Sequence, residues 1–566
     1  MPKRGVPIPR YVSADRQSKR RKASKSFVVV DDDDFQLPSS LPPLPAGPST
    51  YAEISKWPID MLHRATLSGE VCTQRMQEFF GGGLRVNGDY SGYDCPREML
   101  TQLWKAMALE EVYSVMPTLT FARSCDNAKV PQQALLYLAN EVDGGKSCVA
   151  TDIEKCLTQE ATNKLNGFLN VAKDVGDNAS FQKAFAEMLG YLLGNLDTVF
   201  KPGLAAPCEV HGCECPHAGA LPEGDSALSV NFAGTTCVGW STVGLRQEFA
   251  HVSERTHAIW LSQRAIMAIK KAEHGFFQEC THRYPVASKL QRPLKPWFFI
   301  VWIKLCGTDC GFPSKRLRIF SFGGSLVSLV WCGPSSQKEI QADFFRLFRR
   351  RVCASGDVYF RAPPSIVDKV YRDLLKKRHM HIPADVSFSP LGRGIFRNAL
   401  TAQQAVRLAE YEEFHADAHG RVPPSLMVDV FQNVHSPGDT SGTDFPSQLK
   451  HGLYYSYKAR RAAVGLEGMV ANGWHIFETE DDTFSSALSP FLKSLPECVL
   501  KGLSGNGMSM PPLCAWVLYV ALHTRRREEG DAQGTTVVQE EDDFDELGGE
   551  DEDEGVGFNE DKDEDA

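Results

Sequence analysis

One cysteine lies in a segment whose composition suits a reactive thiol. Residues 233–244 read Ala-Gly-Thr-Thr-Cys-Val-Gly-Trp-Ser-Thr-Val-Gly, with Cys237 near the centre. Small residues and glycines on both sides would let a flexible loop hold the thiol exposed. A single cysteine is more often a small buried apolar residue, so the segment alone does not assign a function. If Cys237 is functional, its chemistry is nucleophilic attack by a thiolate.

Two further segments could supply charged groups. Residues 276–281, Phe-Phe-Gln-Glu-Cys-Thr, place Glu279 at the end of a predicted strand, where α/β sheets bind ligands. Arg316 and Arg318 lie two residues apart in another predicted strand, so we expect their side chains on one face. Two guanidinium groups on one face suit phosphate or carbonyl oxygens. A surface carboxylate and a solvated edge strand are the alternatives.

In this order the three segments resemble the motifs of the DNA cytosine-5 methyltransferase family. Its nucleophile loop carries Gly-Pro-Pro-Cys-Gln-x-x-Ser, its acid strand Glu-Asn-Val, and its arginine strand Gly-Val-Pro-Gln-x-Arg-x-Arg. The resemblance implies that Cys237 is the nucleophile, Glu279 the acid and Arg318 the arginine that contacts the target cytosine. Both prolines and the glutamine of the nucleophile loop are absent here, and the family's Asp-x-Arg segment survives only as the arginine of 253–255.

The implied reaction explains why these residue types are needed. A thiolate adds to carbon 6 of cytosine while an acid holds nitrogen 3, so that carbon 5 becomes nucleophilic enough to accept a methyl group. The target base must first leave the duplex. The resemblance therefore implies DNA as the partner and S-adenosylmethionine as the methyl donor. Two alternatives stay open: a catalytically inactive relative that binds DNA or partners, and an RNA cytosine-5 methyltransferase.

The resemblance also implies a cofactor site at the carboxyl ends of the first three strands. The family motif Asp-x-Phe-x-Gly-x-Gly-Gly corresponds to residues 88–95, in which Tyr90, Ser91 and Gly92 match. The leading aspartate and the two later glycines are replaced by Gly88, Asp94 and Cys95. Those glycines leave room for a ligand in the family, so the replacements bear directly on cofactor binding.

Further cofactor residues follow from the same resemblance. The second strand normally ends in a ribose-binding acid; Ser124 stands there, and Asp126 is a possible substitute. Asp152 corresponds to the aspartate that contacts the adenine amino group. Near the C-terminus, 461–474 resembles the family's Arg-x-Leu-Thr-x-x-Glu motif, and Asn506 belongs to its Gly-Asn-Ser/Ala motif, which folds back beside the first strand.

The elements that must position these residues follow the pattern of a parallel α/β sheet. Short apolar runs alternate with helical stretches, and the predicted strands are 84–86, 118–122, 147–153, 276–278, 298–304 and 316–322. An apolar helix is predicted at 512–522. The fold class implied is α/β, the Rossmann-like fold of S-adenosylmethionine-dependent methyltransferases, with a smaller target-recognition domain.

We predict five regions along the chain. They are a disordered basic segment (1–50), a catalytic α/β domain with a Cys-rich insertion (51–329), a target-recognition domain (330–455), the C-terminal part of the catalytic domain (456–527) and a disordered acidic tail (528–566).

Charge is distributed unevenly between the two ends. Residues 1–26 hold nine lysines and arginines against one aspartate, which resembles a nuclear localisation signal. Residues 528–566 hold nineteen acidic residues against one lysine, and could contact basic nuclear proteins or simply aid solubility. No 18-residue apolar run exists, so we expect no membrane span. Sixteen cysteines without an export signal should be mostly reduced.

Two other clusters have open interpretations. Arginines alternate with phenylalanines over 344–351, and 376–379 is basic; both could contact nucleic acid, or both could be amphipathic helices with solvated faces. The second cluster is dense in soft ligands: Cys208, His211, Cys213, Cys215 and His217. It could hold zinc, but the spacing is not that of a standard finger and no second ligand pair is obvious, so no metal site is assigned.

Overall fold

The computed structural model describes residues 43–217, 226–235, 238–240, 247–379, 400–435, 441–477 and 482–531. The chain divides into two units, 1–44 and 45–566, and every element below belongs to the second. Cys237 therefore lies outside the described residues, as do nearly all of the basic N-terminal segment and of the acidic tail. Within the described part, no helix is long and apolar enough to span a bilayer.

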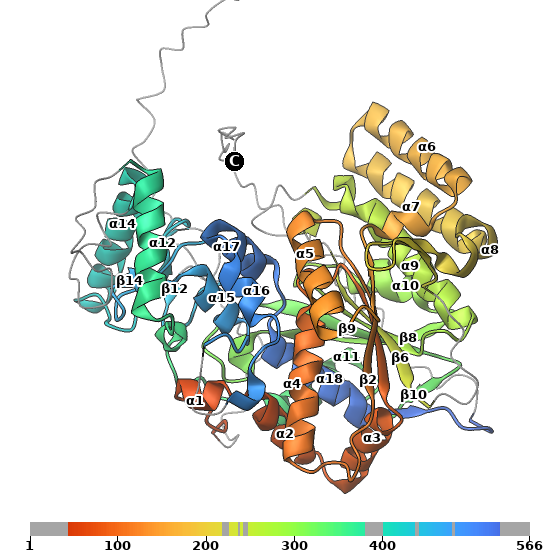
Figure 1. Ribbon diagram of the computed structural model, residues 1–566, viewed down its shortest axis with the longest axis horizontal. Coiled ribbons are helices and arrows are strands. Elements are labelled where there is room, and N and C mark those ends of the chain that lie inside the picture. The colour runs from red at the N-terminus through yellow and green to blue at the C-terminus, as the bar shows by residue number, and fades with distance from the viewer. Residues whose placement is uncertain are drawn as a thin grey trace, which may run out of the picture. The chain divides into compact units, whose positions relative to one another are not determined.

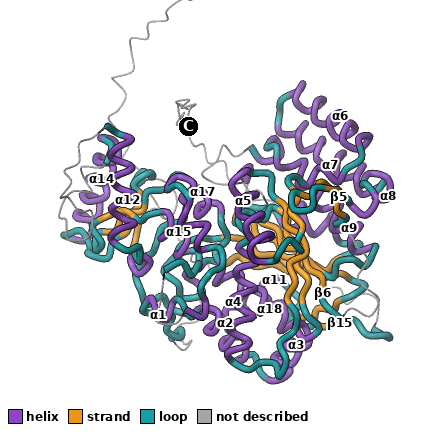
Figure 2. The backbone as a smooth tube through the Cα atoms, viewed as in Figure 1, coloured by secondary structure: helices purple, strands orange, loops and turns teal. Residues whose placement is uncertain are grey.

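A nine-stranded sheet forms the centre of this unit (Figures 1 and 2). Its order is β5-β4-β3-β2-β1-β6-β7-β9-β8. The five strands from β3 to β7 in this order run parallel, whereas β9 is antiparallel to both β7 and β8. The strands are β1 (Leu84–Asp89), β2 (Leu119–Cys125), β3 (Cys148–Ala150), β4 (Ala206–Cys208), β5 (Cys213–Cys215), β6 (Leu228–Gly234), β7 (Gly275–Thr281), β8 (Phe298–Leu305) and β9 (Arg318–Ser325).

Helices cover both faces of the sheet because alternate strand residues are apolar on both sides. In β7, Phe277 belongs to one hydrophobic core cluster and the adjacent Phe276 to the other. The first face packs on α2 (Trp57–Thr66), α3 (Glu70–Gly81), α4 (Cys95–Leu109), α11 (Gln337–Phe348) and α18 (Met510–His523). The second packs on α6 (Gln159–Val175), α7 (Asn178–Gly194), α9 (Ser253–Ile269) and α10 (Arg292–Leu294). This strand order and layering confirm the predicted Rossmann-like α/β fold.

All six predicted strands are present, with bounds shifted by a few residues. The prediction missed β6, the strand that leads into the Cys237 segment. Its sequence alternates apolar residues with Ser229 and Asn231, yet these polar residues are buried as well. Asn231 donates to Asp89 at 2.9 Å, and the Ser229 amide donates to His274 Nδ1 at 2.9 Å. A strand buried on both faces carries polar residues only where such partners exist.

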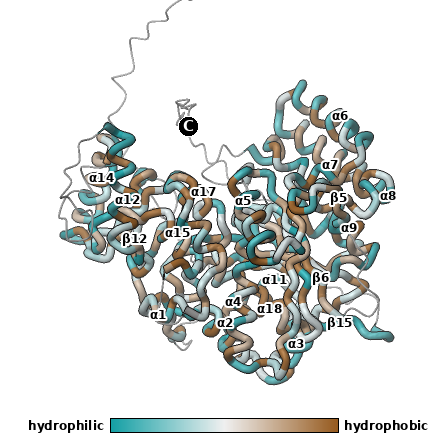
Figure 3. Tube along the Cα trace, in the orientation of Figure 1, coloured by the Kyte–Doolittle hydropathy of each residue, from teal (hydrophilic) through white to brown (hydrophobic). Residues whose placement is uncertain are grey.

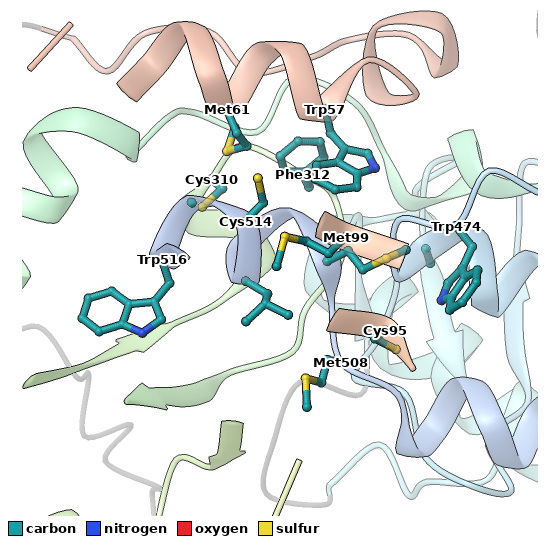
Figure 4. Close-up of a cluster of buried hydrophobic side chains, with 14 of the residues drawn as sticks. Trp57, Met61, Cys95, Met99, Cys310, Phe312, Trp474, Met508, Cys514 and Trp516 are labelled. Atoms are coloured by element: carbon teal, nitrogen blue, oxygen red, sulfur yellow. The ribbon is translucent and has the colours of Figure 1, made fainter. Parts of the chain in front are cut away.

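The predicted apolar helix is confirmed as α18, and all of its residues are buried. Its side chains join those of α2 and α4 in the cluster of Figure 4, where Cys514 lies near Met61 and Met99. Hydrophobic segments concentrate around this helix and the central sheet, whereas the outer turns of α6 and α14 (Ala402–His419) are more hydrophilic (Figure 3). The C-terminal residues are therefore part of the main core.

A smaller sheet begins in the region predicted to recognise the target (330–455) and ends a few residues beyond it. Its order is β12-β11-β13-β14, with strands Ser441–Gly442, Met427–Asp429, Tyr454–Ser456 and Arg461–Ala462. The helices α12 (Pro364–Lys377) and α14 are in the same region. The remaining elements are α1 (Tyr51–Ile54), α5 (Lys129–Tyr137), α8 (Leu196–Val199), α15 (Gly465–Ala471), α16 (Ser489–Ser494), α17 (Glu497–Asn506) and the strand pair β10 (Leu329–Trp331) and β15 (Thr524–Arg526).

Candidate active site

The order of the sheet reverses between β1 and β6. Strands β2 and β3 continue on one side of β1, and β6 and β7 on the other. Ligands of open α/β sheets bind outside the carboxyl ends of the strands at such a switch point. Most of the predicted site residues end one of these five strands or follow it closely, so the topology brings them to one edge.

The loop after β1 has an uncommon backbone. Tyr90, Gly92 and Asp94 have φ angles of 50°, 55° and 64°, so every second residue is left-handed. A left-handed conformation costs a residue other than glycine about 1–2 kcal/mol, so its surroundings must hold it. Ser91 does so: its amide donates to the Cys125 carbonyl at 2.9 Å, and its hydroxyl accepts from the Cys125 amide at 3.1 Å.

Open space adjoins this loop at Gly92. A β-carbon added there would meet nothing within 4 Å. The Gly92 amide donates to Asp126 Oδ2 at 2.9 Å, so the loop after β1 is bound to the residue that follows β2. Asp126 Oδ1 also accepts from the Ala128 amide at 2.8 Å. Burial raises the pKa of Asp126, and the amides that donate to its carboxylate oppose that shift.

The second predicted cofactor carboxylate, Asp152, lies two residues after the end of β3. Asp152 Oδ1 accepts from the Glu154 amide at 2.9 Å and caps the short 3-10 turn Ile153–Cys156. The Gln132 side chain donates to the Asp126 and Thr151 carbonyls at 2.9 and 3.3 Å. The ends of β2 and β3 are thus joined, and both carboxylates belong to the same edge of the sheet.

Two residues that depart from the family pattern contact each other. Ser124, at the position of the ribose-binding acid, donates its hydroxyl to Asp94 Oδ2 at 3.0 Å, and both residues are buried. Burial raises the pKa of Asp94. Cys95 lies in the hydrophobic core among Met99 and Met508 (Figure 4). The protein interior therefore accommodates both replacement side chains, and the space beside Gly92 is left open.

The C-terminal motif returns to this loop. A β-carbon added at Gly507 would lie 1.7 Å from the Tyr93 hydroxyl, and one added at Gly234 would lie 2.8 Å from Met508 Cε. The segment after α17 therefore lies against both the loop after β1 and the end of β6. Asn506, the predicted cofactor residue, is exposed immediately before this contact.

The predicted acid and arginine form an ion pair. Glu279 in β7 is the register partner of Gly234 in β6 and lies close to the end of its strand. Arg318 Nε lies 3.0 Å from Glu279 Oε1, and both side chains are largely buried. Arg316, expected on the same strand face, lies before the first residue of β9 and is buried. Its guanidinium donates instead to the carbonyl of Gly505, in the C-terminal segment, at 3.1 Å.

Described residues on both sides of Cys237 are anchored. On one side, Thr235 Oγ1 accepts from the Gln278 side chain at 2.8 Å, which attaches the segment to β7. On the other, Trp240 Nε1 donates to Glu254 Oε1 at 3.1 Å. Glu254 is the middle residue of the 253–255 segment, so that segment is bonded to Trp240, three residues after Cys237.

The sequence did not reveal Lys289, the residue that forms an ion pair with Glu254. The buried ammonium of Lys289 pairs with its carboxylate. The same ammonium lies 4.8 Å and 4.9 Å from the ring centroids of Phe185 and Trp240, so cation–π attraction adds to the ion pair. Burial lowers the pKa of Lys289, opposed by Glu254. No sequence pattern marks Lys289, because its partners come from three distant segments.

A buried charge network fixes β1 beneath the loop. Asp89 pairs with Arg123 at 2.8 Å and with Arg264 at 3.2 Å, and Arg264 also pairs with Glu273 at 2.5 Å. Burial alone would raise the pKa of Asp89, but the two guanidinium groups lower it. Burial raises the pKa of Glu273 to about 8. The network joins β1, β2 and α9.

The arginine and phenylalanine cluster over 344–351 contains both core and exposed residues. Phe344 and Phe348 are core residues of α11. Arg350 is buried, pairs with Asp60 at 2.6 Å and donates to the Cys310 carbonyl, so it has structural partners. Arg346 and Arg351 are exposed, as are Lys376 and Lys377 of the second basic cluster at the end of α12.

Comparison with known proteins gives structural likenesses only. No protein-family model matches the sequence, and no curated protein matches it. Among solved structures, a Dnmt2 methyltransferase of S. pombe is 11% identical with a TM-score of 0.36, covering 77% of this chain and 98% of its own. The Entamoeba histolytica methyltransferase EhMeth is 10% identical with a TM-score of 0.32, covering 77% and 97%. A putative prophage DNA modification methyltransferase of E. coli is 10% identical with a TM-score of 0.34, covering 77% and 98%.

Proposed function

We propose that this protein transfers a methyl group from S-adenosylmethionine to carbon 5 of cytosine in DNA through a covalent cysteine adduct. One observation carries the proposal. The loop after β1, Asp126, Asp152 and the Glu279–Arg318 pair share one edge of the sheet at its switch point. Cys237 follows Gly234, the register partner of Glu279, by three residues.

The residues at this edge fit an adenosyl cofactor. Asp126 and Asp152 offer carboxylates for the ribose hydroxyls and the adenine amino group, and Gly92 faces open space. The replacements Asp94 and Cys95 make contacts within the protein, so they leave this space free. When bound, S-adenosylmethionine supplies an electrophilic methyl group on a sulfonium centre.

The protein's own residues would perform the remaining chemistry. The Cys237 thiolate forms a bond to carbon 6 of a flipped cytosine, and Glu279 donates a hydrogen bond or proton at nitrogen 3. Carbon 5 then takes the methyl group, a base removes its proton, and the bond between sulfur and carbon 6 breaks. In this proposal Arg318, which pairs with Glu279, orients that carboxylate and contacts the base. The hydrogen bonds of Thr235 and Trp240 fix the described residues on both sides of Cys237.

Trapping with a fluorinated substrate tests this proposal. Duplex DNA that contains 5-fluorocytosine is incubated with the full-length protein and S-adenosylmethionine. Fluorine at carbon 5 cannot leave as a proton, so the adduct should survive denaturation and appear as a mass increase of the protein. Cys237→Ser should abolish the adduct, because a hydroxyl is far less nucleophilic at neutral pH. Glu279→Gln should slow adduct formation without preventing it.

Cys280→Ser is the matched control, since Cys280 is adjacent to Glu279 and buried; its adduct should form as in the wild type. Trapping of Cys237→Ser would overturn the assignment of the nucleophile. Absence of any adduct, although DNA and cofactor both bind, would favour an inactive relative. A parallel incubation with transfer RNA, followed by mass spectrometry of 5-methylcytosine, separates the RNA alternative.

A further inference from the structure

Four potential metal ligands from separate segments meet at the edge of the sheet. Cys148 begins β3, Cys208 ends β4, His211 lies in the following turn and Cys215 ends β5. Their ligand atoms all lie within 4.8 Å of one another. Three of the four belong to the Cys-rich group in the sequence, and the structure adds Cys148, which is 63 residues before His211. Cys213 and His217 are not members of this set.

The three distances between sulfur and nitrogen match those of tetrahedral coordination. The sulfur atoms of Cys148, Cys208 and Cys215 lie 3.5, 3.4 and 3.3 Å from His211 Nδ1. Zinc bonds of about 2.3 Å to sulfur and about 2.0–2.1 Å to nitrogen place a tetrahedral sulfur–nitrogen pair about 3.6 Å apart. The sulfur atoms lie within 4.8 Å of one another, so all three surround the same side of the imidazole.

The imidazole of His211 is oriented as a ligand. Its Nε2 lies 3.1 Å from the Gly145 carbonyl oxygen, which can only accept a hydrogen bond. Nε2 therefore carries the proton, and Nδ1 presents a lone pair toward the three sulfur atoms. One lone pair accepts one hydrogen bond from a thiol, so hydrogen bonding alone does not explain three sulfur atoms at this distance.

From these observations we infer that Cys148, Cys208, His211 and Cys215 bind a zinc ion. Three thiolates and one imidazole in a tetrahedral arrangement favour zinc over the divalent ions that prefer oxygen ligands. Four protein ligands leave no open coordination position, so the site is structural and not catalytic. His211 is exposed, so an ion can reach the site from solvent.

The position of the site explains what the ion stabilises. Strands β3, β4 and β5 have three residues each, and β4 pairs with β3 at a single register position. Strand pairings this short contribute little stability by themselves. The bound zinc ion would fix the β4–β5 hairpin to β3. The chain continues from β3 directly to Asp152. The same hairpin leads to buried His217, which contacts Arg123 at 3.3 Å within the charge network beneath β1.

Metal analysis of the full-length protein tests the inference without reference to methyl transfer. We expect about one zinc ion per chain by plasma mass spectrometry. Replacement by Co²⁺ should give thiolate-to-cobalt charge-transfer bands and the intense ligand-field bands of a tetrahedral site. Cys148→Ser and Cys215→Ser should lose most of the bound metal. Cys213→Ser should retain it, because Cys213 lies in the same hairpin and outside the ligand set.

The wild-type cobalt spectrum and thiol alkylation do not depend on the folding of any variant. In the wild type, iodoacetamide should modify exposed Cys213 at once, and Cys148 and Cys215 should react only after a chelator is added. A metal-free wild type without a cobalt spectrum would overturn the inference. So would a disulfide among the three cysteines, or loss of metal from Cys213→Ser equal to that from Cys215→Ser.

Discussion

Individual side chains around the nucleophile segment have separable roles. Trp240 contributes a hydrogen bond to Glu254 and one face of the aromatic surroundings of Lys289. Its ring also packs edge-on against Phe249 at 5.3 Å between centroids. A phenylalanine at position 240 would keep much of the apolar contact and remove only the N–H donor. The hydrogen bond that restrains the loop can therefore be tested by itself.

We predict that Trp240→Phe slows adduct formation with 5-fluorocytosine DNA about fivefold, because a hydrogen bond contributes about 1 kcal/mol. Single-turnover trapping measures the rate. Trp104→Phe is the control: it removes an equivalent indole hydrogen bond, to the Pro117 carbonyl at 2.9 Å, far along the chain from the loop. Equal slowing in both variants would show a general loss of stability and not a role for the Trp240 anchor.

Among the elements, the segment after α17 packs against the loop after β1. The segment after α17 approaches Tyr93 so closely that only glycine fits at position 507. Arg316 adds a second attachment through its bond to the Gly505 carbonyl. The sheet edge and the C-terminal helices are thereby held at two adjacent points.

Gly507→Ala should destabilise the protein by about 1–3 kcal/mol, because the added methyl group would overlap the Tyr93 hydroxyl. Gly502→Ala offers a control in α17, the helix that ends just before Gly507, since the nearest neighbour of the added methyl group would be 3.9 Å away and alanine favours helix. Urea denaturation measures both free energies of unfolding. A Gly507→Ala variant as stable as Gly502→Ala would contradict the close contact with Tyr93.

For the whole molecule, neutral histidines in the core link distant segments. His475 donates through Nε2 to the Ser55 carbonyl and stacks on Trp57 at 6.2 Å between centroids, joining the C-terminal region to α2 and the turn before it. Burial lowers the pKa of His475 to about 4. Burial also lowers the pKa of His217 and of His257. Protonation of these side chains therefore opposes folding.

The direction in which stability changes with pH follows from proton binding in the folded and unfolded states. Between about pH 6.5, where histidine protonates in the unfolded chain, and pH 4, the unfolded state binds the proton that folded His475 excludes. The stability that neutral His475 contributes is present above about pH 6.5 and is lost as the pH falls toward 4. We predict that His475→Gln, which keeps an N–H donor without the titration, reduces the loss of stability from pH 7 to pH 5 by about 2 kcal/mol.

Urea unfolding at the two pH values tests this prediction. The wild type, measured at the same two pH values, is the reference. If His475→Gln loses as much stability as the wild type on acidification, the buried neutral state assigned to His475 is incorrect.

Local sequence determined much of this protein. Alternating apolar runs specified the sheet strands, and an unbroken apolar stretch specified α18, because strand and helix periodicity depend on neighbouring residues. The order of the motifs also anticipated that Asp126, Asp152, Glu279 and Arg318 would belong to neighbouring strand ends. For Asp126, Asp152 and Glu279 that inference needs only parallel strands, whose carboxyl ends share an edge. Arg318 begins β9, and it reaches the same edge because β9 is antiparallel to β7.

Contacts between distant segments were decided by the tertiary structure alone. Cys148 joins the Cys-rich hairpin only because β3 and β4 are neighbours in the sheet. Nothing in the sequence distinguishes Arg350 from an exposed arginine. It is buried because it packs beside α2, where Asp60 pairs with its guanidinium. The bond between Ser124 and Asp94 likewise requires β1 beside β2. Sequence spacing carries no information on such pairs, because their distances depend on strand order and helix packing.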